Sequence, residues 1–142
     1  MSDAAHTELI AKLQKRATTG LPGHLGLQVA DAEPGRCELT MPLTAHHLAP
    51  NGYLHAGSVV TLADTTCGFG CVSSLPAGAN GFTTIELKAN FLGTTTQGAL
   101  RCTATLEHGG GRTQVWDAAV FAEDGKRIAL FRCTQMILYP KG

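Results

Sequence analysis

The chain has 142 residues, a length that suits one domain with a single hydrophobic core. Its 11 basic and 11 acidic residues balance and only 15% of its residues are charged, so it lacks the basic surface that attracts nucleic acids or anionic membranes. We therefore expect its partners to be small molecules or further copies of the same chain, with no nucleic acid and no membrane among them.

The cysteines and the first residues indicate a cellular compartment. The five cysteines are odd in number and form no CxxC pair, which argues against a disulfide framework or a zinc site, so we expect no metal. The opening MSDAAHTELIAKLQKR has no apolar leader, and no run of 18 residues is apolar enough to span a bilayer. These features predict a soluble, cytoplasmic protein.

The first predicted elements are a short amphipathic helix and two strands. Ser2 or Asp3 can cap a helix over about residues 3–18, and Gly20 can stop it. Two segments with a period of two follow, and the turn sequence EPG separates them, which predicts two antiparallel strands. The alternating residues are Leu25, Leu27 and Val29, and then Cys37, Leu39, Met41 and Leu43.

The middle of the chain predicts a long central helix. Residues 55–75, HAGSVVTLADTTCGFGCVSSL, are apolar or small on every side, so this helix should be enclosed by other structure. Asn80 and Gly81 predict a turn. Four strand-like segments follow, with the hairpin sequence EDGK between the last two, at residues 85–91, 100–106, 113–121 and 127–138.

This order of elements predicts an α+β fold in one domain over residues 1–142. A helix that is apolar all round needs cover on its whole circumference, which a curved six-stranded antiparallel sheet wrapped around it would supply. Such a sheet keeps open edges and apolar outer faces. We therefore expect the chain to associate with itself by an edge or a face.

One charge interrupts the apolar helix. Asp64 is the only formally charged side chain between Leu39 and Ile85. A lone buried carboxylate is costly unless it is paired, hydrogen-bonded or protonated. It is either a structural group bonded to a nearby hydroxyl or a functional group that faces a substrate channel. The nearby hydroxyls on the helix belong to Thr61, Thr65 and Thr66.

Three segments carry a resemblance to a known family. NGYLHAGSVVTLAD, TTIELKANFLGT and GGGRTQVWDAAVFAEDGKRIA resemble the hotdog-fold acyl-CoA thioesterases of the phenylacetate-degradation and 4-hydroxybenzoyl-CoA thioesterase type. The family pattern is G-x-x-H-G-G with an acid nine residues after the histidine. It is matched here by Gly52, His55, Ala56, Gly57 and Asp64. Ala56 departs from the family glycine but keeps the backbone N–H that the family uses.

The resemblance implies the chemistry of thioester hydrolysis. That reaction needs an activated water or a carboxylate nucleophile, an electrophilic contact to the thioester oxygen, and a pocket for CoA. A helix that begins near His55 presents the N–H groups of Ala56 and Gly57 in its first turn, where the helix dipole favours an oxyanion. Asp64 is then the candidate general base or nucleophile.

Helix geometry separates these two groups. Nine residues of α-helix turn through about 900 degrees and rise about 13.5 Å, so Asp64 and His55 lie on opposite sides of the helix. If both act, Asp64 of one subunit should meet the helix N-terminus of its partner, giving two sites in each two-fold dimer. The resemblance implies the same arrangement, in a homodimer or a dimer-of-dimers homotetramer.

Other candidate residues have a functional and a structural interpretation. His55 acts through its imidazole or only caps the helix, and Asn51 orients the thioester or only makes the PNG turn. Relatives often carry Asn or Gln six residues before the histidine, where this chain has Ala49. Thr84 matches a hydroxyl that positions water in some relatives, and it also suits an ordinary strand.

The resemblance also implies a channel for CoA, with Arg112 meeting a phosphate. The alternative for this GGGR turn is a plain flexible hairpin. The channel residues would be Phe91, Gly93, Thr94 and Thr95 in one segment, and Gly110, Gly111 and Arg112 in the other.

We therefore expect a thioesterase that hydrolyses an aryl- or medium-chain acyl-CoA and needs no cofactor. Water activation and an anhydride intermediate are both compatible with the sequence. One alternative is a hotdog module that binds acyl-CoA without turnover, against which the retained carboxylate argues. The other is a hotdog enoyl-CoA hydratase or dehydratase, which typically needs an Asp-His dyad in a different arrangement.

Overall fold

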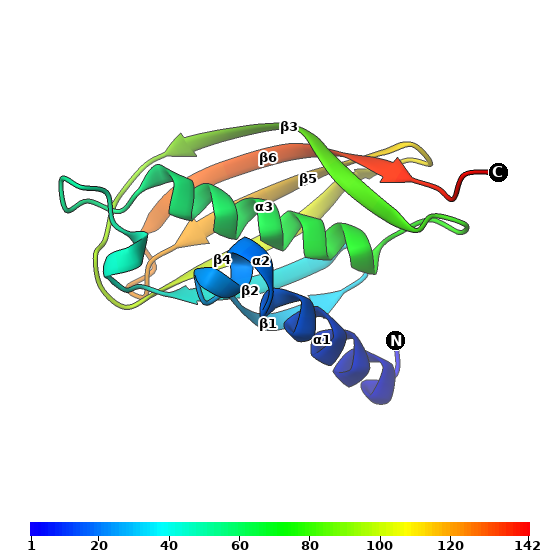
Figure 1. Ribbon diagram of the computed structural model, residues 1–142, viewed down its shortest axis with the longest axis horizontal. Coiled ribbons are helices and arrows are strands. Elements are labelled where there is room, and N and C mark those ends of the chain that lie inside the picture. The colour runs from blue at the N-terminus through cyan, green and yellow to red at the C-terminus, as the bar shows by residue number, and fades with distance from the viewer.

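Six antiparallel strands curve around one long helix in the computed structural model, which describes residues 1–142 (Figure 1). The strands are β1 (Gln28–Glu33), β2 (Arg36–Pro42), β3 (Gly81–Phe91), β4 (Ala99–Gly109), β5 (Thr113–Phe121) and β6 (Arg127–Leu138). They neighbour one another in the order β1-β2-β4-β5-β6-β3, so β1 and β3 are the two edges. The predicted α+β fold is confirmed.

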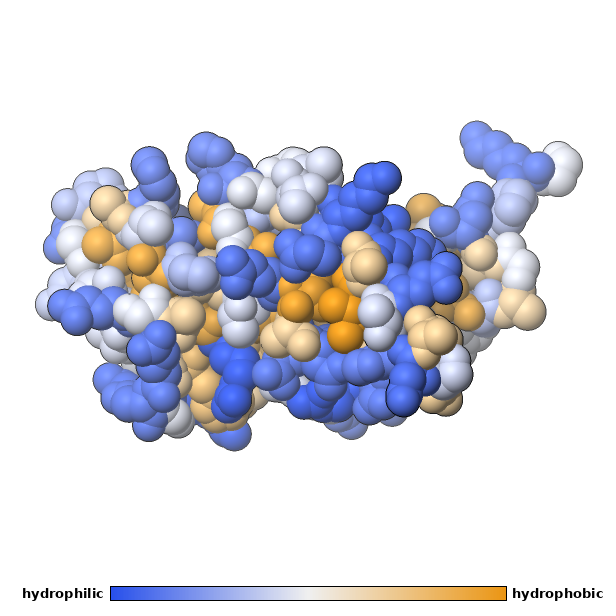
Figure 2. Space-filling model, turned by 90° about the horizontal axis from the view of Figure 1, so that it is seen from below, coloured by the Kyte–Doolittle hydropathy of each residue, from blue (hydrophilic) through white to orange (hydrophobic).

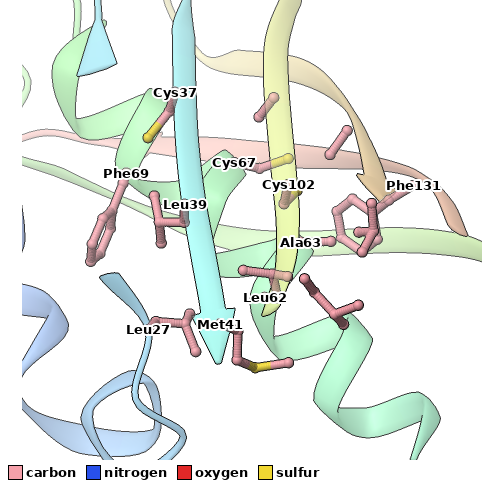
Figure 3. Packing of buried hydrophobic residues seen from close by; sticks show 14 of the residues in the cluster. Leu27, Cys37, Leu39, Met41, Leu62, Ala63, Cys67, Phe69, Cys102 and Phe131 are labelled. Carbon is pink, nitrogen blue, oxygen red and sulfur yellow. The ribbon is translucent and has the colours of Figure 1, made fainter. Parts of the chain in front are cut away.

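The central helix α3 (Ala56–Ser73) contacts all six strands, as its apolar circumference requires. Figure 3 shows Leu62 and Cys67 of α3 directed toward β2 and β4, whose Met41 and Cys102 are equally buried. All five cysteines are buried and free. Burial raises the pKa of Cys37, Cys71 and Cys102 to about 12, so these thiols stay neutral and pack as small hydrophobic groups.

Two glycines let α3 approach its neighbours closely. A β-carbon at Gly68 would lie 2.7 Å from Cζ of Phe82, and one at Gly70 would lie 2.6 Å from the ring of Trp116. Both distances are shorter than any ordinary contact between carbon atoms. The loss of helix propensity at these glycines therefore has a packing reason, because only glycine leaves room for the two rings.

The N-terminal region is helical for longer than the sequence predicted. Helix α1 (Asp3–Ala17) is confirmed, but a second short helix, α2 (Gly20–His24), follows it, and β1 begins only at Gln28. The prediction of a strand at Leu25 and Leu27 was wrong. Both residues turn into the core from the loop around Gly26, whose φ is +74°, so their alternation reflects a buried turn. Neither α1 nor any other helix is long and apolar enough to cross a membrane.

The start of β3 also differs from the prediction. The turn expected at Asn80 and Gly81 lies earlier, around Gly78 with φ +84°, and the Asn80 N–H already donates to the Leu138 carbonyl at the head of the strand. The register with β6 shifts between Thr84 and Glu86. At this bulge the side chains change which face of the sheet they point to. The alternation of apolar residues after the bulge therefore does not predict which residues before it point inward.

One edge strand of the sheet is covered by a helix and the other is exposed. Helix α1 packs against β1, and the Gln14 side chain accepts a hydrogen bond from the Val29 N–H. Figure 2 shows the molecule from below the view of Figure 1, the side of β1 and α1, where hydrophobic atoms form small groups among hydrophilic ones. At the β3 edge, Ile85, Phe91 and Leu92 are 52%, 48% and 54% exposed. The β3 edge is therefore the open, apolar edge.

Candidate functional site

Asp64 is half buried on the side of α3 that faces β3. The Thr84 hydroxyl of β3 lies 2.9 Å from Asp64 Oδ1 and can donate to it, and none of the ion pairs in the chain includes Asp64. Burial raises the pKa of Asp64, and the Thr84 hydrogen bond opposes this rise. The carboxyl group is therefore more basic than an exposed aspartate, and no cation neutralises it.

The hydroxyl groups on the helix itself do not reach Asp64. The Thr61 hydroxyl donates to the Gly57 carbonyl and the Thr66 hydroxyl donates to the Leu62 carbonyl, each four residues earlier. Threonines inside helices commonly bond in this way, which removes them as partners for a neighbouring carboxylate. The partner of Asp64 comes instead from a strand 20 residues further along the chain.

The N-terminus of α3 offers one free N–H. His55 caps the helix, and its Nδ1 accepts a hydrogen bond of 2.7 Å from the Gly57 N–H. The sequence predicted free N–H groups at both Ala56 and Gly57, but the second is occupied by this cap. The Ala56 N–H, at the first helical position, has no partner in the chain and is exposed. It is the available electrophilic group at this end.

Two loops hold this helix end in place. Asn51 Oδ1 accepts from the Tyr53 N–H at 3.1 Å, which is the structural interpretation of the PNG turn. His47, which the sequence analysis did not single out, is buried, and its carbonyl accepts from the His55 N–H and the Ser58 hydroxyl. Its ring bonds the Leu25 carbonyl at 2.7 Å, so His47 ties the start of α3 to the N-terminal region.

Within one chain, the two predicted CoA-binding segments lie at opposite ends of the sheet. Phe91 pairs with Ala129 at the start of β6, and the N–H groups of Leu92 and Gly93 donate to Ile128. The turn with Gly110, Gly111 and Arg112 lies at the other end, where the Arg112 carbonyl accepts from the Ile137 N–H. Ile137 is eight residue steps along β6 from Ala129, a distance of about 27 Å. One chain alone therefore does not bring the two segments together.

Comparisons with known proteins show the family to which the chain belongs. The family described as Thioesterase superfamily matches residues 51–129, which include the start of α3, Asp64 and all of β3. The 1,4-dihydroxy-2-naphthoyl-CoA hydrolase of Listeria monocytogenes is 31% identical over 115 residues, 81% of this chain and 93% of that protein. The chain belongs to the thioesterase superfamily. The predicted enzyme class, a thioester hydrolase, is confirmed.

Other relatives of this thioesterase include the acyl-coenzyme A thioesterase PaaI of Escherichia coli. It is 34% identical over 109 residues, covering 76% of this chain and 75% of that protein. A solved thioesterase of Haemophilus influenzae superposes with a TM-score of 0.85 at 25% identity, covering 92% of this chain and 90% of that one. The predicted hotdog fold is confirmed by this likeness.

The raised pKa of Asp64 predicts how the stability of this thioesterase depends on pH. Between the ordinary value of 3.8 and the raised one, the folded state holds more protons than the unfolded state. The free energy of unfolding therefore falls as the pH rises through this interval. Asp64→Asn is neutral at every pH and can still accept from Thr84, so we expect it to melt at a higher temperature than the wild type at pH 7.

Thermal unfolding followed by circular dichroism from pH 3 to pH 8 checks this expectation, and the difference should shrink as the pH falls toward 3.8. Asp117→Asn is the control with the opposite sign. The hydrogen-bonded Arg132 lowers the pKa of Asp117, so that substitution removes a favourable pair at pH 7. An Asp64→Asn protein that melts no higher than the wild type at pH 7 would contradict the prediction.

Proposed function

We propose that this thioesterase hydrolyses an acyl-CoA to a free acid and CoA without a cofactor, with Asp64 as general base or nucleophile. The observation that carries the proposal is the half-buried carboxylate of Asp64, which has a hydroxyl partner and no cation. The relatives named as a 1,4-dihydroxy-2-naphthoyl-CoA hydrolase and an acyl-coenzyme A thioesterase support a CoA thioester as the substrate.

The environment of Asp64 suits both roles. A carboxylate whose pKa is raised by burial is a better proton acceptor near neutral pH than an exposed one. In the water route, Asp64 takes a proton from the attacking water and can return it to the departing thiolate. In the nucleophile route, its oxygen attacks the thioester carbon and the C–S bond breaks to release the CoA thiolate, and water then hydrolyses the resulting anhydride to the free acid and the Asp64 carboxylate. The free Ala56 N–H would stabilise the oxyanion in either route.

We propose that each site is shared between two copies of the chain, in a homodimer or a dimer-of-dimers tetramer. The Ala56 N–H lies eight residues before Asp64, about 12 Å along the axis of α3, and the two CoA-binding segments lie at opposite ends of the sheet. Antiparallel pairing of two β3 edges would set opposite ends of the two sheets side by side. The exposed apolar residues on that edge support this contact, since it would bury them.

Two single substitutions test the assigned roles. Asp64→Asn should lower kcat/KM about 100-fold to 10,000-fold, because it removes the base or nucleophile. Ala56→Pro deletes the free N–H and should lower kcat about 100-fold to 1,000-fold. Proline is tolerated at the first helical position, and His55 already has the extended conformation, φ −71° and ψ 131°, that a following proline requires.

Thiol release from a panel of aromatic and straight-chain acyl-CoAs measures both effects, with circular dichroism to check the fold. Ala56→Ser keeps the N–H and is the matched control. Near-normal hydrolysis by folded Asp64→Asn would overturn the assignment of Asp64. Binding of CoA thioesters in calorimetry, with no hydrolysis of any by the wild type, would instead support the non-catalytic module.

Mixed dimers test whether the site is shared. If each site combines Asp64 of one copy with Ala56 of the other, a dimer of an Asp64→Asn chain and an Ala56→Pro chain has one intact site. Refolding equal amounts together should recover about a quarter of wild-type activity, because about half of the dimers are mixed and half of their sites are intact. Each variant refolded alone is the control. No recovery in mixed dimers isolated through two affinity tags would contradict a shared site.

The packing beside Asp64 points to the size of the acyl group. Gly68 lies one helical turn beyond Asp64, and Phe82 lies two residues from Thr84 on the same face of β3. The Phe82 ring packs directly on Gly68, so it closes the space between α3 and β3 just past the carboxylate. The ring also lines a hollow of about 300 Å³, whose other lining residues are both apolar, such as Val72 and Leu75, and polar, namely Lys12, Arg16 and Asn80.

We therefore expect Phe82 to limit the length of the acyl chain and to favour an aryl group. Phe82→Ala would remove the ring between Gly68 and the hollow, and the kcat/KM ratio of decanoyl-CoA to phenylacetyl-CoA should rise at least about 10-fold. Phe121→Ala is the control, because that ring lies against Arg101 and Arg127, away from Asp64. An unchanged chain-length profile in Phe82→Ala would show that the acyl group does not extend toward Phe82.

A further inference from the structure

A buried glutamine lies directly behind the candidate catalytic pair. Gln135 of β6 has no exposed surface, and its Oε1 is 2.8 Å from the Thr84 hydroxyl oxygen. On its other side, Gln135 Nε2 donates to Cys133 Sγ at 3.3 Å. Four side chains from three elements therefore form a row that runs from the half-buried Asp64 into the core: Asp64, Thr84, Gln135 and Cys133.

When Asp64 is ionised, the two oxygen–oxygen contacts of the Thr84 hydroxyl have only one proton between them. The Thr84 hydroxyl has one proton but two oxygen neighbours, Asp64 Oδ1 at 2.9 Å and Gln135 Oε1 at 2.8 Å. If Asp64 is protonated, it donates to Thr84, and Thr84 donates to Gln135. If Asp64 is ionised, Thr84 donates to the carboxylate, and its oxygen then needs a donor from the other side.

The amide of Gln135 can serve both states. Rotation by half a turn about its last side-chain bond exchanges the oxygen with the NH2 group, so the same side chain either accepts from Thr84 or donates to it. In the rotated state, Oε1 faces Cys133, whose thiol can donate. An apolar side chain of the same size could neither donate nor accept. The neighbouring inward positions of β6 hold the buried Cys133 and Ile137, so a buried amide between them needs a reason.

We propose that Gln135 is a positioning residue for the catalytic base, and that its amide keeps the Thr84 hydroxyl donating to the ionised Asp64 and turns when Asp64 takes up a proton. The inference rests on the proposed role of Asp64. In the proposed site, Gln135 does not contact the substrate. Its strand, β6, would nevertheless help to set the protonation of the Asp64 carboxyl group.

No charged group packs around Asp64, so its hydrogen bonds set its protonation together with its burial. The titratable neighbours on α3 and β6 are thiols, Cys67 and Cys133. The charged residues of β3 and β6 are all exposed, namely Glu86, Lys88, Arg127 and Arg132. Burial raises the pKa of Asp64 and the Thr84 bond lowers it, so weakening that bond should raise the pKa further.

The sheet also provides a matched control. Gln114 of β5 is opposite Gln135 in the strand register and is only 2% exposed. Its amide donates to the Ser74 carbonyl and accepts from the Trp116 indole, and it has no bond to Thr84. A substitution at Gln114 should therefore cost a comparable amount of stability while leaving the hydrogen bonding of Asp64 unchanged.

The experiment measures kcat/KM against pH for acyl-CoA hydrolysis by Gln135→Met, Thr84→Val, their combination and Gln114→Met. Gln135→Met should move the acid limb upward by about one pH unit, which lowers kcat/KM about tenfold on that limb, with KM nearly unchanged. Thr84→Val should shift the limb in the same direction, and the double variant should add little to the larger single shift. Gln114→Met should lower the melting temperature without moving the limb.

If Gln135→Met does not fold, Gln135→Leu is the second variant, and the shift in Thr84→Val is required in any case. An unmoved acid limb in a folded Gln135 variant, or an equal shift in Gln114→Met, would overturn the positioning role. This outcome is distinct from failure of the proposed function, because in that case Asp64→Asn would keep its activity.

Discussion

The apolar circumference of α3 is the constraint on which the rest of the structure depends. A helix of this kind is stable in water only when other elements surround it, and α3 contacts every strand of the sheet. The sheet can curve this closely because Gly68 and Gly70 leave room for the rings of Phe82 and Trp116. The one charged side chain of the helix, Asp64, then faces β3, the strand at the open edge.

This position joins stability to chemistry. The burial that stabilises the fold also raises the pKa of Asp64, because water around a carboxylate is replaced by poorly polarisable neighbours. The Thr84 hydroxyl offsets part of this effect, and the same hydroxyl is within hydrogen-bond distance of the buried Gln135 side chain. A group with no cationic partner in such a place destabilises the fold when ionised. The proposed role in proton transfer at the thioester accounts for such a group in a thioesterase, whereas packing alone does not.

Sequence periodicity predicted the elements well wherever local pattern and tertiary burial agree. The central helix, expected over residues 55–75, is Ala56–Ser73, and β5 and β6 have the predicted bounds. Periodicity gave a wrong strand at Leu25 and Leu27, because these two residues are buried although they lie in a turn. Asp64 could be singled out because a lone charge is visible in sequence. Thr84 was a candidate through the family resemblance, but its contacts with Asp64 and Gln135 could not be predicted, because the bulge after Thr84 sets the register that joins these residues.

The open β3 edge connects the fold with the proposed shared site. An unpaired edge exposes backbone donors and acceptors and is a liability for a folded protein. At β1 this liability is reduced by α1, whose Gln14 accepts from the Val29 N–H, whereas the β3 edge carries exposed Ile85 and Phe91. Pairing of two β3 edges would cover these residues. Because the paired strands are antiparallel, it would also set the helix start and Phe91 segment of one copy near the opposite end of the other. The same contact would then remove an exposed edge and complete a site whose parts are separated within one chain.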